Sequence, residues 1–356
     1  MYFSLLNISP NLKAFRSNPF YKYDQRDPSQ LPATMLLLQY HNLLLKSILT
    51  ERLEPGAQPI AIDQIVSDFD NVTFHISTPE TKSKILISMY IKCAPDLKKY
   101  NVDKIMKREY GAYLLPTPES GYNFSLLLDL QELQSLDVTE REALIDKISL
   151  LKRTALAAPF ERAFDEFDEL AADAAKQNLE LYVPEASKVE VLAIHYREQE
   201  SIFIKPSHDR VTVIFSTIFK DETDRIFGRV FLQEFVDARR RAIQNAPQVL
   251  YSQKEPPLEI RDLPGVRASD DNVGYVTFVL FPRHLKPQRR ENCISHIQTF
   301  RDYFHYHIKC SKAYMHSRMR YRVSEFLKVL NRAKPENEET KERKTASGRR
   351  FDTVRR

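Results

Sequence analysis

The sequence predicts an α+β protein built from two successive sheet-and-helix units and a long C-terminal helix. Short alternating runs rich in β-branched residues recur in two groups, and helical-period segments separate them. The stretch from Gln288 to Lys334 has no Gly or Pro, and Pro287 and Pro335 bracket it as start and stop signals. As one helix it would be about 70 Å long. No compact core of this size covers such a length, so we expect something outside the chain to pack on it.

These signals divide the chain into five parts. Residues 1–34 are polar and contain four prolines, so we expect a disordered N-terminal extension. A first α/β domain is expected at 35–153 and a second at 154–286. The long helix takes 287–334, and the charged tail at 335–356 is expected to be disordered.

The first domain begins with dense apolar residues at helical spacing from Met35, ending before Pro55-Gly56. Two alternating β-branched runs follow, joined by a polar turn, and a charged helical segment then stops at Gly111. We expect helices at 35–53 and 95–110 and strands at 73–77, 84–92, 112–116 and 122–130.

The second domain repeats this layout after a helical bridge at 138–176, with Pro159 as a break. An amphipathic helix carries Phe231, Phe235 and Ala238 on one face. We expect strands at 189–198, 201–206, 209–219, 248–252 and 274–282 and a helix at 228–245.

Charge is distributed unevenly along the chain. The net charge is +5, but residues 283–356 hold 20 Lys and Arg against 8 Asp and Glu, and the remainder is acidic. A basic C-terminal arm on an acidic body predicts an acidic partner. No apolar run approaches the length that crosses a bilayer, and Cys93, Cys293 and Cys310 are scattered. We therefore expect a cytoplasmic protein with reduced thiols.

Sequence patterns of catalysis are missing. The seven glycines form neither a GxGxxG nor a GxxxxGK[ST] loop, and no GxSxG or HExxH motif occurs. His307 and Cys310 would share a helix face while His305 points away, which offers two metal ligands where structural zinc needs four. The sequence supports neither an enzyme, a cofactor nor a metal site.

Several long blocks in the same order identify a family. They include PESGYNFSLLLDL (118–130), DRVTVIFSTIFKDETD (209–224), APQVLYSQKEPPLEI (246–260), NVGYVTFVLFPRH (272–284) and FRDYFHYHIKCSKAYMHSRMR (300–320). Over about residues 35–350 the chain resembles the large scaffold subunit family, subunit 2, of the actin-related protein 2/3 complex. It departs from the family in residues 1–34 and in a longer acidic insertion near 167–190.

The resemblance implies two ferredoxin-like α/β sandwich domains and a non-catalytic scaffold in the actin cytoskeleton. Its long helix would pair with that of subunit 4, beside the two actin-related subunits and the remaining subunits. The pair would bind the side of the mother actin filament during nucleation of branched networks.

Apolar positions in the long helix give the expected interface with subunit 4. Their spacing is mostly three or four, and between 303 and 314 a second apolar face appears, which calls for two partners. The expected interface residues are Ile297, Phe300, Tyr303, Phe304, Tyr306, Ile308, Tyr314, Met315 and Met319. The alternative is a larger core within the chain itself.

Basic residues give the expected contact with the filament, because an actin filament presents an acidic surface. The expected filament-binding residues are Lys309, Lys312, Arg318, Arg320, Arg322, Lys328, Arg332 and Lys334. The alternative is a solvated face that keeps the helix soluble.

A different class remains as an alternative function. Ferredoxin-like sheets with a basic arm also occur in nucleic-acid-binding modules. The strands hold Phe278 and Phe281 but no RNP-like string, so we expect no nucleic acid partner. Aromatic residues on two helix faces instead of one also disfavour a membrane-surface helix, and no membrane insertion is expected.

Overall fold

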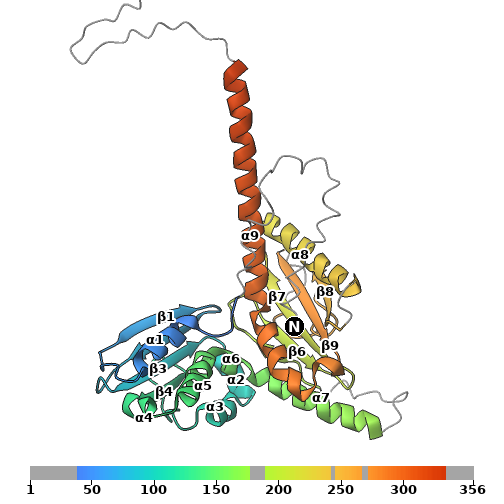
Figure 1. Ribbon diagram of the computed structural model, residues 1–356. Coiled ribbons are helices and arrows are strands. Elements are labelled where there is room, and N and C mark those ends of the chain that lie inside the picture. The colour runs from blue at the N-terminus through green and yellow to red at the C-terminus, as the bar shows by residue number, and fades with distance from the viewer. Residues whose placement is uncertain (1–37, 177–188, 242–244, 267–271, 334–356) are drawn as a thin grey trace, which may run out of the picture. The chain divides into compact units, whose positions relative to one another are not determined.

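The computed structural model describes residues 38–176, 189–241, 245–266 and 272–333, which hold two antiparallel sheets and the helices around them (Figure 1). The expected extension at 1–34, the tail at 335–356 and Lys334 lie outside the described residues, as does most of the second half of the acidic insertion.

The first sheet is a meander of four strands in the order β1-β2-β3-β4. Its strands are β1 (Asp63–Asp68), β2 (Val72–Ser77), β3 (Lys84–Ile91) and β4 (Phe124–Asp129). The turn between β1 and β2 places Asp70 and Asn71 at φ 64° and 56°. Asp and Asn tolerate this left-handed region better than other residues with a Cβ, so the tight turn suits its sequence.

Short helices cover one face of the first sheet. They are α1 (Leu43–Leu53), α2 (Ala94–Lys99), α3 (Val102–Tyr110), α4 (Leu130–Gln134), α5 (Val138–Ser149) and α6 (Leu151–Leu156). Asn42 caps α1 by accepting from the Leu45 amide at 2.9 Å, and Asp137 caps α5 through the Thr139 amide. Alternate strand residues such as Phe74 and Ile87 are fully buried beneath these helices.

The second sheet has the order β5-β6-β7-β9-β8. Its strands are β5 (Leu192–Ile194), β6 (Ile202–Pro206), β7 (Val211–Ile218), β8 (Gln248–Gln253) and β9 (Val273–Leu280). Helix α8 (Glu222–Arg241) connects β7 to β8, and β9 is inserted between these two strands. Because β9 is antiparallel to both, β7 and β8 run parallel, which is the split βαβ arrangement.

The predicted α+β class is confirmed, with two antiparallel sheets and a long C-terminal helix. The ferredoxin-like detail fits only the second sheet, which contains the split βαβ unit. The first sheet differs because its four described strands lie side by side in sequence order, so these strands form no split βαβ unit.

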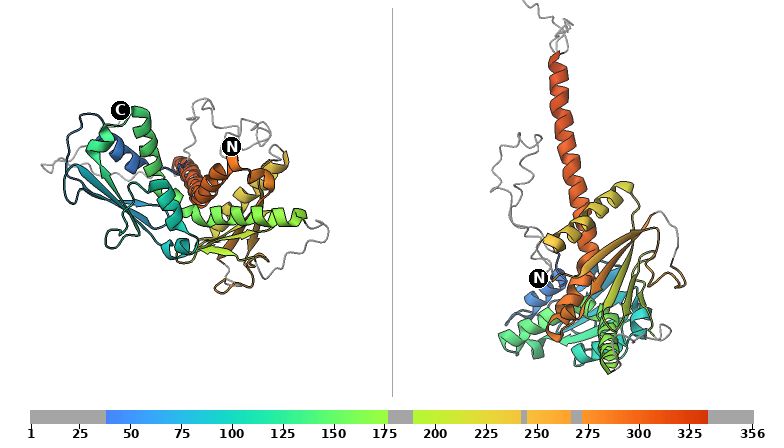
Figure 2. Two further views of the ribbon diagram at one scale, coloured as in Figure 1. Left: turned by 90° about the horizontal axis from the view of Figure 1, so that it is seen from below. Right: turned by 90° about the vertical axis from the view of Figure 1, so that its right-hand side faces the viewer.

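Both faces of the second sheet are covered. Helix α7 (Ala158–Lys176), α8 and the start of α9 (Pro287–Ala333) lie on one face, where Phe164, Leu232 and Phe300 join the main core (Figure 2). Residues 256–266 lie against the other face, with Ile260 fully buried. Strand β9 is accordingly buried at every position.

One compact unit extends as far as Ile308, and the residues from Lys309 onward form a separate unit. The first part of α9 therefore belongs to the same body as the two sheets. A short 3₁₀ turn, η6 (Pro282–His284), leads into it from β9. The expected domain boundaries at 153 and 286 remain predictions.

Candidate functional site

Helix α9 runs without interruption from Pro287 to Ala333, as its sequence predicts. Proline at the first position costs no hydrogen bond there, and no later Gly or Pro weakens the helix. Arg290 donates to the Leu285 carbonyl at 2.8 Å and forms an ion pair with Asp168 of α7. Both contacts stabilise the first turn of α9. Its 47 residues correspond to a length of about 70 Å.

Up to Ile308, α9 buries an aromatic and aliphatic stripe in the core of its own chain. The Phe300 ring lies 4.6 Å from Phe278 and 5.4 Å from Phe215, both on the second sheet. Phe304 packs against Phe231 of α8 at 5.6 Å. These contacts are mostly tilted or edge-to-face, the geometries that aromatic pairs favour.

This burial corrects part of the expected interface with subunit 4. Ile297, Phe300, Tyr303, Phe304 and Ile308 are all buried within the chain itself. A side chain already enclosed by its own core has no surface left for a partner. The alternative of a larger intramolecular core is right for these five residues.

Tyr306 is half-buried, and its ring contacts the ring of His307. Tyr314, Met315 and Met319, the other three expected interface residues, are exposed. The structure therefore separates the nine expected residues into five buried residues up to and including Ile308, the half-buried Tyr306, and three exposed residues beyond Ile308.

Beyond Ile308, α9 exposes large apolar side chains along its whole described length. They are Tyr314, Met315, Met319, Tyr321, Val323, Phe326, Leu327, Val329 and Leu330. Met319 is 61% exposed and Phe326 is 62% exposed. Single exposed apolar residues are ordinary on protein surfaces, but a contiguous group of this size marks an interaction site.

Four of these residues follow the spacing of a coiled-coil seam. Met319, Val323, Phe326 and Leu330 are separated by four, three and four residues, so they line one side of the helix. We call these four residues the seam. A shallow groove beside it is lined by His316, Met319, Arg320, Val323, Ser324, Leu327, Lys328 and Asn331. The expected interface stopped at Met319 and missed the last three seam residues, although their spacing was visible in the sequence.

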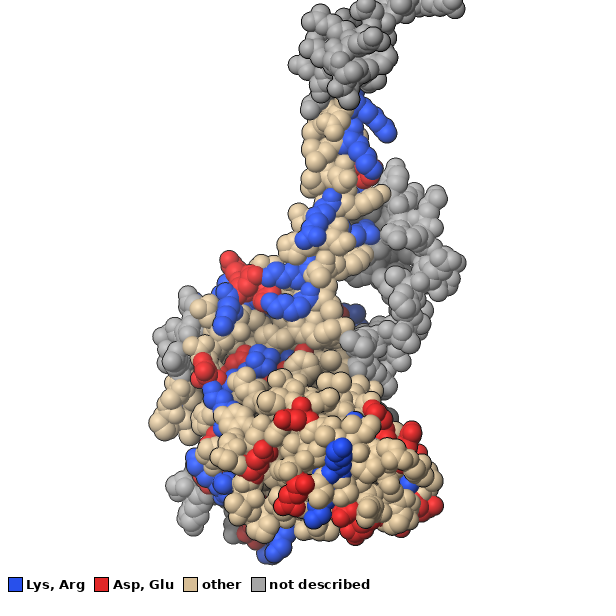
Figure 3. Space-filling view, turned by 90° about the vertical axis from the view of Figure 1, so that its left-hand side faces the viewer, with Lys and Arg blue, Asp and Glu red and all other residues tan. Residues whose placement is uncertain are grey.

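The described basic residues expected to bind the filament surround the helix and do not form one face. Arg318 and Arg320 are two residues apart, so their side chains point about 200° apart around the axis. Figure 3 shows several Lys and Arg side chains on the exposed part of α9, with uncharged surface between them. Arg318 lies over the Tyr314 ring at 5.7 Å, and Lys328 pairs with Glu325 at 2.8 Å.

Lys328 and Arg332 lie on the side of α9 away from the seam. At 100° per residue they point about 180° and 140° from Met319. Arg322 points about 60° from Met319, beside the seam. A helix packed on the seam would thus leave Lys328 and Arg332 accessible and bring Arg322 close to itself.

The rings of His305 and His307 in α9 lie in aromatic contacts. His305 stacks near Phe219 at 6.0 Å and His307 near Phe231 at 5.6 Å, so both rings are used in packing. Among the residues that the structure describes, no group of three His, Cys, Asp or Glu side chains could hold a metal ion. No helix within the described ranges is long and apolar enough to cross a membrane.

A family profile described as "Arp2/3 complex, 34 kD subunit p34-Arc" matches residues 87–337, from β3 to just past the end of α9. The chain belongs to the p34-Arc family. This confirms the resemblance noted in the sequence, since the match includes the second sheet and the whole of α9.

Two curated relatives support the membership in the p34-Arc family. The "Actin-related protein 2/3 complex subunit 2" of Schizosaccharomyces pombe is 59% identical over 320 residues, 89% of this chain and 99% of the relative. The protein of the same name from Dictyostelium discoideum is 42% identical over 318 residues, with the same coverage. The similarity extends along nearly the whole length of both relatives and 89% of this chain, and the family profile includes α9.

Proposed function

We propose that this chain is a non-catalytic scaffold subunit of the actin-related protein 2/3 complex and acts in the cytoplasmic actin cytoskeleton. Its partners would be subunit 4, the two actin-related subunits and the remaining subunits. Membership in the p34-Arc family and the names of the two relatives support this assignment. The observation that carries the proposal is the exposed apolar seam on α9.

The seam is the proposed contact with the long helix of subunit 4. A 4-3-4 spacing keeps apolar side chains on one side of a helix and suits knobs-into-holes packing with a second helix. Tyr314 and Met315 precede the seam and are exposed in the same way. The interface assigned to this partner therefore runs from Tyr314 to Leu330.

The side of the mother actin filament is the proposed second partner of α9. An acidic surface attracts Lys and Arg, and such attraction weakens as salt rises. Of the eight basic residues expected from the sequence, Lys328 and Arg332 have the geometry that best fits this role, because they point away from the seam. Arg318, Arg320 and Arg322 flank the seam and would also be near a paired helix.

The test of the helix pairing uses side chains that the chain itself does not need. Met319→Asp combined with Phe326→Asp puts two charges into the seam, whereas the chain's own core stays intact. Each apolar side chain buried in an interface contributes roughly 1.5–3 kcal/mol, so the pair should weaken association with subunit 4 at least 100-fold. Co-purification of the co-expressed subunits measures this loss.

Tyr321→Asp is the matched control. Tyr321 is 65% exposed but points about 200° away from Met319. This variant should co-purify with subunit 4 as the wild type does. Normal co-purification of the double variant would refute the seam as the interface, and equal losses in both variants would show that no single side of α9 is responsible.

A further inference from the structure

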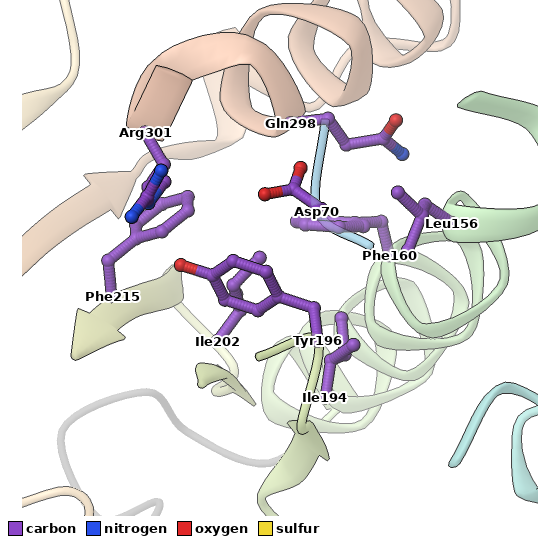
Figure 4. Close-up of a pocket in the computed structure, with 9 residues that line it drawn as sticks. All are labelled: Asp70, Leu156, Phe160, Ile194, Tyr196, Ile202, Phe215, Gln298 and Arg301. Atoms are coloured by element: carbon purple, nitrogen blue, oxygen red, sulfur yellow. The ribbon is translucent and has the colours of Figure 1, made fainter. Parts of the chain in front are cut away.

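A cluster of buried and partly buried charges joins the first sheet, the second sheet and α9 within the compact unit. Its carboxylates come from the end of β1, the β1–β2 turn, the β5–β6 connection and α9, and its cations from α6, the same connection and α9. The members are Asp68, Asp70, Lys152, Arg197, Glu200, Arg301 and Asp302. Figure 4 shows the Asp70 and Arg301 side chains at one small cavity, together with the Tyr196 hydroxyl.

Two pairs in the cluster have close contacts. Arg301 Nη2 lies 2.7 Å from a Glu200 carboxylate oxygen and Nε donates to the same oxygen at 2.9 Å. The other Glu200 oxygen accepts from the Ile218 amide at 3.1 Å. Arg197 contacts one Asp70 oxygen through both Nε and Nη2 at 3.0 Å. The negative charges of Glu200 and Asp70 are therefore well compensated.

Lys152 is shared between Asp68 at the end of β1 and Asp70 in the β1–β2 turn. Its ammonium lies 3.5 Å from both Asp68 and Asp70, and it donates to the Phe69 carbonyl at 3.0 Å. Asp68 also accepts from the Asn42 amide group at 2.9 Å. The positive charge of Lys152 thus compensates the carboxylates of Asp68 and Asp70.

Asp302 has the weakest compensation of the four carboxyl groups. Its nearest cationic nitrogens are Arg301 Nη1 at 3.4 Å and Arg197 Nη2 at 3.8 Å, and both arginines make closer contacts with other acids. Its side chain is only 8% exposed. Four carboxylates against three cations would leave one uncompensated charge in this buried place, which is costly.

We propose that Asp302 holds a proton that balances this charge and that the cluster is a proton-operated latch, closed while Asp302 is protonated and loosened when the proton leaves. The latch connects the β1–β2 turn and the β5–β6 connection to α9. All its members belong to the compact unit that ends at Ile308, whereas the seam begins at Met319.

The surroundings of the Asp302 carboxyl support this assignment. Burial and the neighbouring Asp70 raise its pKa to about 7, and Lys152, Arg301 and Arg197 oppose the shift only in part. The Tyr196 hydroxyl is buried, and its burial raises its pKa well above the usual value. Tyr196 therefore stays neutral near pH 7, whereas the raised pKa of Asp302 lies in this range.

The sign of the pH effect follows from the raised pKa. The closed latch binds a proton that an open, solvated Asp302 would lose near pH 4. Stability of the closed state is therefore highest at low pH and falls as pH rises through about 7. From the closed and open pKa values, linkage gives an increase of roughly eightfold in the opening equilibrium between pH 6 and pH 7.5.

The test is backbone hydrogen exchange of the full chain in the assembled complex at pH 6 and pH 7.5, corrected for the intrinsic exchange rate. Peptides covering 66–74 and 196–204 report on the two sides of the latch. The wild type should lose roughly eightfold in protection, the figure that linkage predicts. Asp302→Asn keeps the shape without the titration, so its protection should be equal at the two pH values.

A second variant and a control complete the design. Asp70→Asn tolerates the left-handed turn and removes the neighbouring charge, so the pKa of Asp302 should fall and the loss of protection between pH 6 and pH 7.5 should become smaller. Asp173→Asn changes an exposed acid of α7 and should behave as the wild type. Wild-type protection that does not change with pH overturns the proposal, as does an unchanged loss in Asp302→Asn or Asp70→Asn.

Discussion

Phe304 and Phe326 are the same residue type in the same helix, but their surroundings are opposite. Phe304 is fully buried in the core of its own chain, and Phe326 is 62% exposed. We therefore expect the two Phe→Ala substitutions to affect different properties. Phe304→Ala should destabilise the chain itself, and Phe326→Ala should mainly weaken association with subunit 4.

The magnitude for Phe304→Ala follows from what its ring touches. It packs against Phe231 at 5.6 Å and Phe219 at 6.0 Å, and the zeta carbon of the ring lies close to the backbone of Gly228. Replacing a buried Phe by Ala removes apolar burial and leaves a cavity, at a cost of about 3–5 kcal/mol. Phe326→Ala removes no such contact within the chain, so its cost there should stay below about 0.5 kcal/mol.

Thermal unfolding of the full-length chain measures the first effect. A loss of this size should lower Tm by roughly 5–15 °C in Phe304→Ala, with almost no change in Phe326→Ala. Titration with purified subunit 4 measures the second effect, and here Phe326→Ala should weaken binding at least tenfold. Equal Tm values for the two variants would refute the division of α9 at Ile308.

Two more substitutions test other parts of the structure. Gly274→Ala in β9 would place a Cβ 2.9 Å from the Phe219 ring and 3.0 Å from the Tyr251 ring. This crowding should lower the free energy of unfolding by about 1–3 kcal/mol, which a denaturant titration measures. A decrease of less than about 0.5 kcal/mol would contradict the packing around Gly274. Lys328→Glu combined with Arg332→Glu should reduce co-sedimentation of the complex with actin filaments roughly fivefold at low salt, with a smaller difference at high salt. Unchanged co-sedimentation would rule out the filament contact on the side of α9 opposite the seam.

Local sequence signals predicted most elements of the fold. The strands expected at 73–77 and 84–92 are observed at Val72–Ser77 and Lys84–Ile91, and the long helix expected at 287–334 is observed over Pro287–Ala333, the last of the described residues. Terminal prolines are a strong signal because they constrain the backbone directly, and alternating β-branched residues are a strong signal because they fit a pleated, half-buried surface.

The failures have identifiable physical causes. Strand β1 was missed because an edge strand with the sequence DQIVSD buries only one residue and shows no apolar alternation. The strand expected at 112–116 is wrong, since only Leu114 makes an isolated bridge to β4. The helix expected at 95–110 is divided at Asn101, whose φ of 62° ends α2 and starts α3.

The division of α9 into a buried and an exposed part could not be predicted from its own residues. Phe300 and Phe326 belong to stripes of the same spacing, so periodicity assigns them equal weight. The difference lies in their tertiary contacts. Phe278 and Phe215 pack against Phe300, whereas nothing in the described chain encloses Phe326. The sequence therefore predicted that α9 packs against two kinds of partner, but it did not predict the residue at which the buried part of the helix ends and the exposed part begins.

The charges beside the seam argue for a different chain as its partner. Arg318, Arg320 and Arg322 lie within about 100° of Met319 on its two sides, and among them and the described residues beyond, only Glu325 is acidic. In a pair formed by two copies of this helix, basic side chains would face basic side chains along much of the contact, which disfavours the pair. A helix with acidic residues beside its apolar stripe would convert the same positions into ion pairs. The seam therefore combines an apolar surface, which favours association in general, with flanking charges that select a partner other than itself.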